Sequence, residues 1–147
     1  MRDEVRVTIG ADEDLVSARA EARALADHLG FSRTDATLIA TAISEIARNI
    51  VVHVGTGEIV LRAIEDERRR GLAVIAHDAG PGIRDVQAAL RDGYAGDSGL
   101  GLGLPGARRL MDEFEIVSEP GCGTTVTMTK WHILDELEML RERRRRG

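Results

Sequence analysis

The chain has 147 residues, which suits a single domain, and its 43% hydrophobic and 31% charged residues exclude a disordered chain. The net charge of -5 disfavours a nucleic-acid partner, and the single cysteine, Cys122, excludes internal disulfides and multi-cysteine zinc sites. No signal peptide opens the chain and no apolar run approaches the roughly 18 residues of a membrane span, so we expect a cytoplasmic protein without a membrane partner.

The N-terminal third predicts one strand followed by two helices. Apolar and polar residues alternate over residues 5–9, which is typical of a strand with one buried face. Apolar residues at helical spacing over 15–29 predict a helix that Gly30 ends. A second amphipathic helix is expected over about 32–54, with Gly55 as its stop.

The middle of the chain changes to the period of a β-strand. Residues 58–66 and 72–78 predict two strands joined by a charged hairpin, 67–71. Residues 85–91 are expected to form one or two helical turns. A polar loop punctuated by glycine follows over 92–98.

The last third predicts a short helix, two strands and a helical tail. The strands are expected at 115–118 and 124–131, and an amphipathic helix within 133–147. Hairpins at two places predict an α/β (α+β) two-layer sandwich, with a mixed, mostly antiparallel sheet and helices on one face. The apolar stripe of the short helix consists of Leu104, Ala107, Met111 and Phe114.

Glu45 and Asn49 lie about one turn apart on the second helix, so their side chains are roughly 5 to 6 Å apart on one face. Asn49 falls at the edge of the apolar arc, where its amide needs a partner. One interpretation is a buried asparagine bonded to neighbouring backbone. The other is a cavity that Glu45 and Asn49 both face, the carboxylate suited to proton abstraction and the amide oxygen to a hard cation.

Glycine-containing segments follow at three places. Asp78 ends an apolar strand, and its carboxylate could accept hydrogen bonds from an exocyclic amine of a ligand. Gly80 and Gly82, which follow it, would let the backbone approach that ligand closely. A plain turn is equally consistent with this segment. Residues 99–106 alternate glycine with leucine and lead into a helix start suited to phosphates. A dinucleotide-binding unit is disfavoured there, because a polar loop precedes the glycines instead of a buried strand. Residues 121–125 by themselves indicate an ordinary hairpin turn.

The order and spacing of these four segments resemble the N, G1, G2 and G3 boxes of the GHKL ATPase and kinase superfamily, which binds Mg-ATP without a P-loop lysine. The near absence of lysine agrees, since Lys130 is the single one. Residues 42–50, 99–106 and 104–114 are similar to the bacterial switch kinases of the RsbT type. The resemblance covers about residues 3–131 and implies the Bergerat ATP-binding fold.

The resemblance divides the chain into an ATP-binding kinase domain, 1–131, and an arginine-rich helical tail, 132–147, that the family as a whole lacks. It also implies a role for each matching residue. Asn49 would bind Mg²⁺, and Glu45 would be the general base. The residues implied to hold the nucleotide are Asn49, Asp78, Gly80, Gly82, Gly99, Gly101, Gly103, Leu104 and Thr125.

Within that set, Asp78 would take the adenine amine, Gly82 would lie against the base and Thr125 would support the adenine pocket. The glycines of residues 99–103 would meet the phosphates. Residues of about 92–98 would form the mobile ATP lid.

The resemblance implies a serine/threonine protein kinase that phosphorylates a STAS-domain antagonist. After release it would bind a downstream partner, a PP2C-type phosphatase. The alternative is an ATP-gated anti-sigma factor or a binding-only switch protein, which would not need Glu45 as a base. A homodimer and the roles of Arg48 and of the tail are left open.

Overall fold

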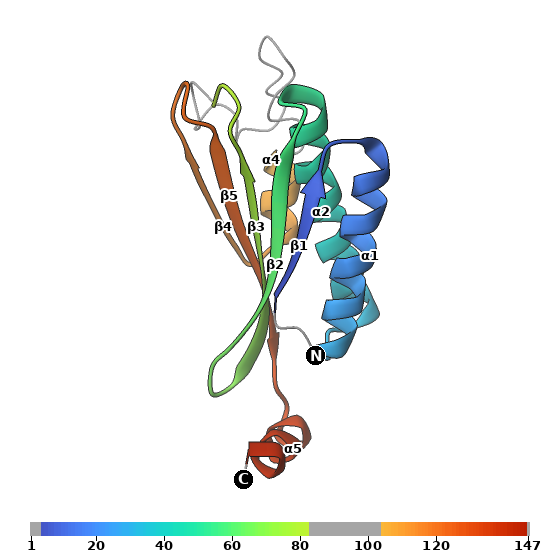
Figure 1. Cartoon of the computed structure of the whole chain (residues 1–147). Helices are drawn as coiled ribbons and strands as arrows, with labels where there is room; N and C mark the ends of the chain where they lie inside the picture. The colour runs from blue at the N-terminus through green and yellow to red at the C-terminus, as the bar shows by residue number, and fades with distance from the viewer. Residues whose placement is uncertain (1–3, 83–103, 147) are drawn as a thin grey trace.

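The computed structural model describes residues 4–82 and 104–146. Its strands form one five-stranded antiparallel sheet in the order β1-β2-β3-β5-β4 (Figure 1). The strands are β1 (Glu4–Ile9), β2 (Gly57–Glu65), β3 (Arg69–Asp78), β4 (Glu113–Ser118) and β5 (Thr124–Ile133). The helices are α1 (Asp12–His28), α2 (Arg33–His53), α4 (Leu104–Leu110) and α5 (Glu136–Arg146).

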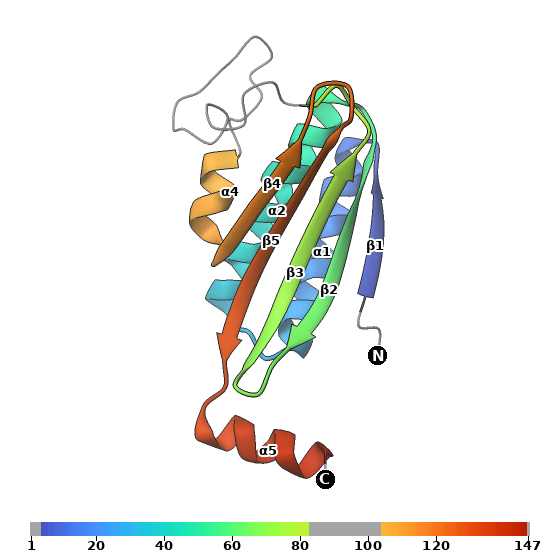
Figure 2. The same cartoon turned by 90° about the vertical axis from the view of Figure 1, so that its left-hand side faces the viewer.

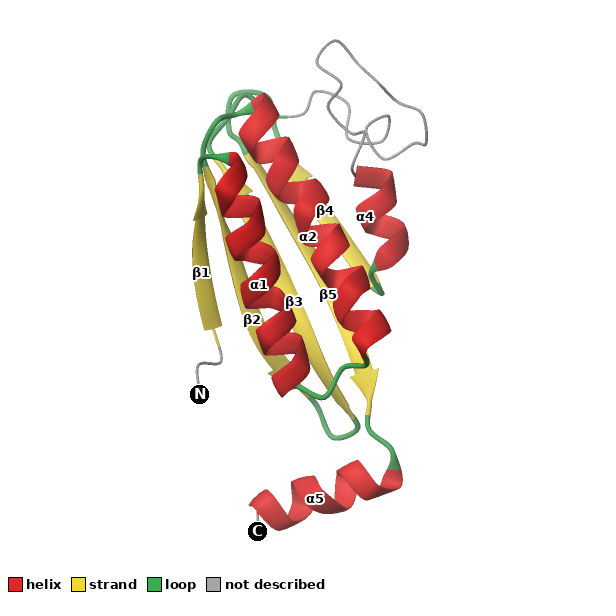
Figure 3. Cartoon of the chain, turned by 90° about the vertical axis from the view of Figure 1, so that its right-hand side faces the viewer, coloured by secondary structure: helices red, strands yellow, loops and turns green. Residues whose placement is uncertain are grey.

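The sheet is covered on one face only. Helices α1, α2 and α4 lie side by side on that face (Figure 3), whereas the described strands are bare on the other (Figure 2). The predicted two-layer sandwich is therefore confirmed, and every strand pair described is antiparallel. None of the described helices is long and apolar enough to cross a membrane.

The core lies between α1, α2 and the covered face of the sheet. Helix α2 begins where predicted, because the Ser32 hydroxyl accepts a hydrogen bond of 3.0 Å from the backbone N–H of Asp35 and so caps the helix. Apolar residues at helical spacing on α2 then meet the alternating apolar residues of β2, β3 and β5. The largest side chains that this packing buries completely are Ile9, Ile39, Ile43, Ile59, Leu61, Leu72, Val74 and Met128.

Several element boundaries differ from the sequence prediction, and those of β3, β5 and α4 matter most. Strand β3 begins at Arg69 and β5 extends to Ile133, so the pairing of these two central strands is longer than expected. Phe114 was predicted on a helical stripe but lies on β4 opposite Met128, because α4 ends at Leu110. Its spacing from Ile116 fits the period of a strand, and both pack against the core. The helical turns predicted at 85–91 and the loop at 92–98 lie outside the described residues.

Helix α5 lies across the end of the sheet where the β2–β3 hairpin turns (Figure 2). Its buried Glu142 pairs with Arg70 of β3 and with Arg145 of its own last turn. Glu138 Oε2 accepts a hydrogen bond of 2.8 Å from His132 Nε2, and the N–H of Leu134 donates to the carbonyl of Arg68. Helix α5 and Leu134 before it thus contact the sheet and the β2–β3 turn through polar groups, and one of these groups is the buried carboxylate of Glu142.

Replacing Glu142 should loosen α5 locally. Burial alone would raise the pKa of Glu142. The hydrogen bond and charge of Arg70, together with the charge of Arg145, outweigh this effect and hold the pKa of Glu142 below its ordinary 4.5. The contact is therefore present above that pH and is lost as pH falls through the lower folded-state pKa. We expect Glu142→Gln to speed hydrogen exchange of the α5 amides at least about tenfold at neutral pH. Glu136→Gln, an exposed position on the same helix, is the control; equal exchange in both variants would disprove the role of Glu142.

Candidate functional site

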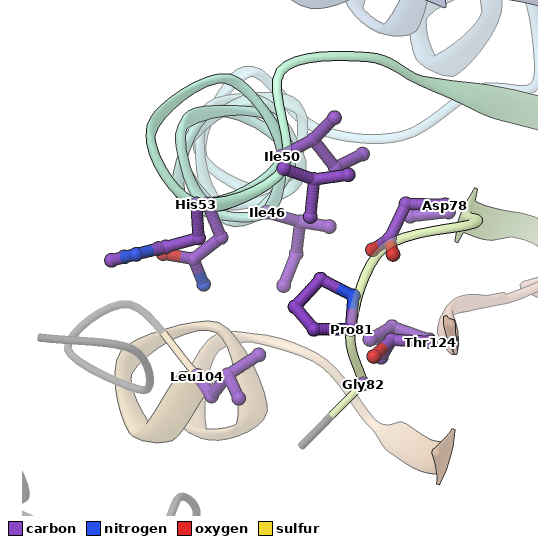
Figure 4. Close-up of a pocket in the computed structure, with 12 residues that line it drawn as sticks. Ile46, Ile50, His53, Asp78, Pro81, Gly82, Leu104 and Thr124 are labelled. Carbon is purple, nitrogen blue, oxygen red and sulfur yellow. The ribbon is translucent and has the colours of Figure 1, made fainter. Parts of the chain in front are cut away.

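A pocket of about 170 Å³ opens at the end of the sheet opposite α5 (Figure 4). It lies between the C-terminal turns of α2, the start of α4 and the paired ends of β3 and β5. Its wall is mainly apolar, with a few polar groups, which is typical of small-molecule sites. The lining residues are Ile46, Asn49, Ile50, His53, Val54, Ala76, Asp78, Pro81, Gly82, Leu104, Thr124 and Val126.

Asn49 brings an unsatisfied amide to this pocket. Its Nδ2 atom is buried and has no hydrogen-bond partner among the described residues. Leaving such a donor unpaired costs about 1 to 3 kcal/mol, which a folded protein rarely tolerates without a reason. Within residues 4–82 and 104–146, neighbouring backbone therefore does not satisfy Nδ2, which favours the interpretation in which Asn49 faces a ligand.

Asp78 ends β3 and is buried, with 9% of its surface exposed. Its Oδ1 accepts a hydrogen bond of 2.9 Å from the backbone N–H of Gly80. Figure 4 shows the carboxylate end turned toward the pocket. No hydrogen bond to its Oδ2 is formed within residues 4–82 and 104–146. Asp78 therefore brings a carboxylate to the pocket, and its binding to a ligand stays a prediction.

Glycine is required where two chain segments cross beside Asp78. Gly82 has φ +78°, and a Cβ there would lie 2.1 Å from the carbonyl oxygen of Glu119. Gly123 has φ +83°, and a Cβ there would lie 2.2 Å from the carbonyl oxygen of Asp78. Both distances are far inside van der Waals contact, so only glycine fits. The turn at 119–123, for which the sequence indicates only an ordinary hairpin, thus packs directly against Asp78 and Gly82, which line the pocket.

Thr124 lines the pocket in place of the predicted Thr125. Thr124 is paired with Asp78 across the two strands, and Thr125 is paired with His77. Successive side chains of a strand point to opposite faces, and Thr125 Oγ1 is hydrogen-bonded to His77 Nδ1 at 2.8 Å on the uncovered face. The prediction for Thr125 is therefore one residue off for a pocket-lining side chain.

The other predicted site residues lie in different places. Leu104 begins α4, is buried and lines the pocket. Gly80 is packed against Val54, the residue that follows α2, and a Cβ on Gly80 would lie 2.7 Å from a methyl group of Val54. Glu45 is half-buried one turn before Asn49 on α2 and does not itself line the pocket. Gly99, Gly101 and Gly103 lie outside the described residues.

His53 and Pro81 were not among the predicted ligand-binding residues, yet both line the pocket. The signal for His53 was present, because it continues the spacing of Glu45 and Asn49 along α2 by another four residues. Burial lowers the pKa of His53 from its ordinary 6.5, so its neutral form is favoured at neutral pH.

Protonation of His53 should therefore oppose folding of the ligand-free protein. The unfolded chain takes up this proton near pH 6.5 and the folded chain only at lower pH, so the free energy of unfolding should decrease as pH falls through that window. We expect His53→Gln to flatten this part of the profile in urea titrations at pH 5.5 to 7.5. His28→Gln, at an exposed position, should not do so; identical profiles for His53→Gln and the parent would contradict the prediction.

Fold and pocket together define a two-layer α/β sandwich domain with a small-molecule pocket at one end of its sheet. The family model described as "Histidine kinase-like ATPase domain" matches residues 10–130, and the chain belongs to this family. Its resemblance to the RsbT-type switch kinases is confirmed. The chain is 45% identical over 131 residues to the serine/threonine-protein kinase RsbT of Bacillus subtilis (strain 168), which covers 89% of this chain and 98% of that protein.

Anti-sigma F factors are also similar. That of Caldanaerobacter subterraneus subsp. tengcongensis is 35% identical over 99 residues, which cover 63% of this chain and 68% of that protein. That of Halalkalibacterium halodurans is 31% identical over 138 residues, which cover 88% of this chain and 93% of that protein.

Proposed function

We propose that this chain is an ATP-dependent serine/threonine protein kinase of the RsbT type that phosphorylates a STAS-domain antagonist and acts as a partner switch in stress signalling. The observation that supports the nucleotide site best is the unpartnered Asn49 amide in a pocket that also presents Asp78 and Gly82. The 45% identity to a protein serine/threonine kinase supports the reaction.

In this proposal Asp78 binds the exocyclic amine of adenine, and the glycine backbone at 80–82 lies against the base. Mg²⁺ would be held by Asn49 Oδ1, because an amide oxygen is a hard ligand, while the unpartnered Nδ2 could donate a hydrogen bond to a phosphate oxygen. Bound there with ATP, Mg²⁺ would neutralise phosphate charge. The glycines of residues 99–103 are proposed to hold the phosphates through their backbone N–H groups.

Glu45 is the proposed general base. It lies on the same side of α2 as Asn49 and is half-buried, so it can reach a hydroxyl presented at the edge of the pocket. Glu45 would accept the proton of a serine hydroxyl of the partner while that oxygen bonds to the γ-phosphorus and the bond to the ADP oxygen breaks. Positioning and charge neutralisation supply most of the rate in such transfers.

The direct experiment is transfer of labelled phosphate from ATP to a STAS-domain protein encoded beside this gene. We expect one serine or threonine of that protein to become labelled in the presence of Mg²⁺. The anti-sigma F relatives favour a second candidate, an ATP-gated binding protein whose partner is a sigma factor. Stable ATP-dependent binding of a sigma factor without labelling of any STAS-domain protein would favour it.

The identity of the partners is also a proposal. A PP2C-type phosphatase is the proposed downstream partner, and the proposed location is the cytoplasm, where ATP is supplied. We further propose that the kinase domain occupies residues 1–131 and that residues 132–147 are an appended tail. A homodimer stays a prediction.

Exchanging Asp78 for asparagine should change nucleobase preference. Asp78→Asn keeps an oxygen that can accept from Gly80 but presents an NH₂ group to the adenine amine, so two donors meet. We expect ATP affinity to fall about 10- to 100-fold with little change in stability. GTP, which carries an oxygen at that position, should lose less. The readout is competitive nucleotide binding, with the exposed Asp27→Asn as control; an unchanged ratio of ATP to GTP affinity would disprove the role of Asp78.

A further inference from the structure

One side of α2 forms an exposed stripe that includes the proposed base. Thr41, Glu45, Arg48 and Val52 follow one another at intervals of four, three and four residues, which places them on one side of the helix. Thr41 and Arg48 are exposed, Val52 is 65% exposed, and Glu45 is half-buried. We call these four residues the α2 stripe.

The α2 stripe faces away from the sheet. The opposite side of the same helix buries Ile39, Ile43, Ile46 and Ile50 in the core. Figure 3 shows α2 running between α1 and α4, with its outer side turned away from the strands. Glu45 lies where the stripe approaches the pocket, since it also shares a side of α2 with Asn49. A molecule whose hydroxyl reaches Glu45 from solvent must therefore cover part of this stripe.

Arg48 and Val52 are available to such a molecule. Thr41 uses its hydroxyl within the helix, since Oγ1 donates to the carbonyl of Thr37 at 2.9 Å. By contrast, the Arg48 guanidinium makes no ion pair or hydrogen bond among the described residues, although Glu45 is only three positions away. Val52 is one of few large apolar side chains in the described chain that are more than half exposed. A free cation thus lies next to an exposed apolar group, each within about one or two turns of Glu45.

We propose that Arg48 and Val52 are docking positions that select the protein substrate, and that the surface around its phosphoacceptor hydroxyl carries an acidic side chain for Arg48 and an apolar one for Val52. This inference rests on the proposed kinase function. A protein interface covers roughly 800 Å² on each partner, so one that delivers a hydroxyl to Glu45 also covers side chains a turn or two away. The chain carries a net charge of -5, so it repels an acidic partner at long range. A local cation such as Arg48 offsets this repulsion at the point of contact.

Charge reversal at Arg48 tests the inference. We expect Arg48→Glu to raise the KM for the STAS-domain protein encoded beside this gene at least about tenfold. Glutamate at this position would repel the proposed acidic side chain of the substrate, which Arg48 attracts. The kcat at saturating protein and the affinity for Mg-ATP should stay within about twofold, since Arg48 does not line the pocket. Arg48→Gln should have an intermediate effect. Val52→Ser should also raise KM, and Arg33→Glu, an exposed position at the other end of α2, is the matched control.

A compensating change in the substrate completes the test. In the substrate, one exposed acidic residue beside the acceptor hydroxyl is changed to arginine. This substrate variant should have a low KM with Arg48→Glu and a raised KM with the parent kinase. If the parent kinase labels the substrate and Arg48→Glu does so with the same KM, the docking inference is wrong and the kinase function stands. An equal loss of Mg-ATP affinity would likewise overturn it. If the parent kinase labels no STAS-domain protein, the proposed function fails and the inference fails with it.

Discussion

Asn49→Ala is expected to abolish tight Mg-ATP binding while leaving the fold intact. The variant removes the proposed metal ligand. Mutation of residues that only hydrogen-bond to a metal ligand typically lowers metal affinity or activity about 10- to 100-fold, and loss of the ligand itself should have a larger effect. We therefore expect the affinity for ATP in Mg²⁺ to fall at least about 100-fold. Because Nδ2 has no partner in the described chain, its removal breaks no hydrogen bond and relieves an unpaired buried donor. The free energy of unfolding should consequently change by no more than about 1 kcal/mol.

Two measurements distinguish this outcome from a structural role. Urea unfolding compares stability, and nucleotide titration compares affinity, for Asn49→Ala and for Asn49→Asp, which nearly preserves volume. Asn49→Asp should also bind ATP weakly, since its carboxylate would repel the phosphates in a partly buried site. If either variant unfolds under conditions in which the parent protein is folded, Asn49 is a structural residue and the assignment to the metal is wrong.

Glu45→Gln is expected to separate phosphoryl transfer from nucleotide binding. A general base contributes about 10²- to 10⁴-fold, so labelling of the STAS-domain protein should fall by that factor. Affinity for Mg-ATP should be retained, because Glu45 does not line the pocket and glutamine has nearly the same shape. Single-turnover transfer and equilibrium nucleotide binding, measured on the same preparation, give both quantities.

Glu65→Gln, an exposed position on β2, is the control for this change of charge. Unchanged transfer with Glu45→Gln would show that another group, or none, acts as the base. Retained partner binding without transfer is the behaviour expected of a kinase converted into a binding-only switch.

The regular elements were predictable because their patterns are local. Helical spacing and the Ser32 cap identify α2, and alternation identifies most of the strands. The extra length of β3 was not predictable in the same way. Arg69 looked like part of a charged turn, but its guanidinium lies 3.8 Å from the ring of Trp131 on the neighbouring strand. Such a contact depends on tertiary pairing, which the local pattern does not contain.

The candidate site was predictable where a motif fixes it and not where strand register does. The pair Glu45 and Asn49 follows from helical spacing alone. The choice between Thr124 and Thr125 depends on the register of β5 against β3, and a shift of one residue moves a side chain to the other face. In the observed register Gly123, which precedes Thr124, packs directly on the backbone of Asp78. Pro81 lies between the predicted Gly80 and Gly82, so its place at the pocket was within reach of the sequence.

The most direct test of the account is calorimetric titration of the purified protein with ATP, with and without Mg²⁺, alongside Asn49→Ala. The account predicts saturable binding that is strong with Mg²⁺, weak in EDTA and weak for the variant under both conditions. Absence of binding by the parent protein in Mg²⁺, or binding of equal strength by parent and variant, would contradict it.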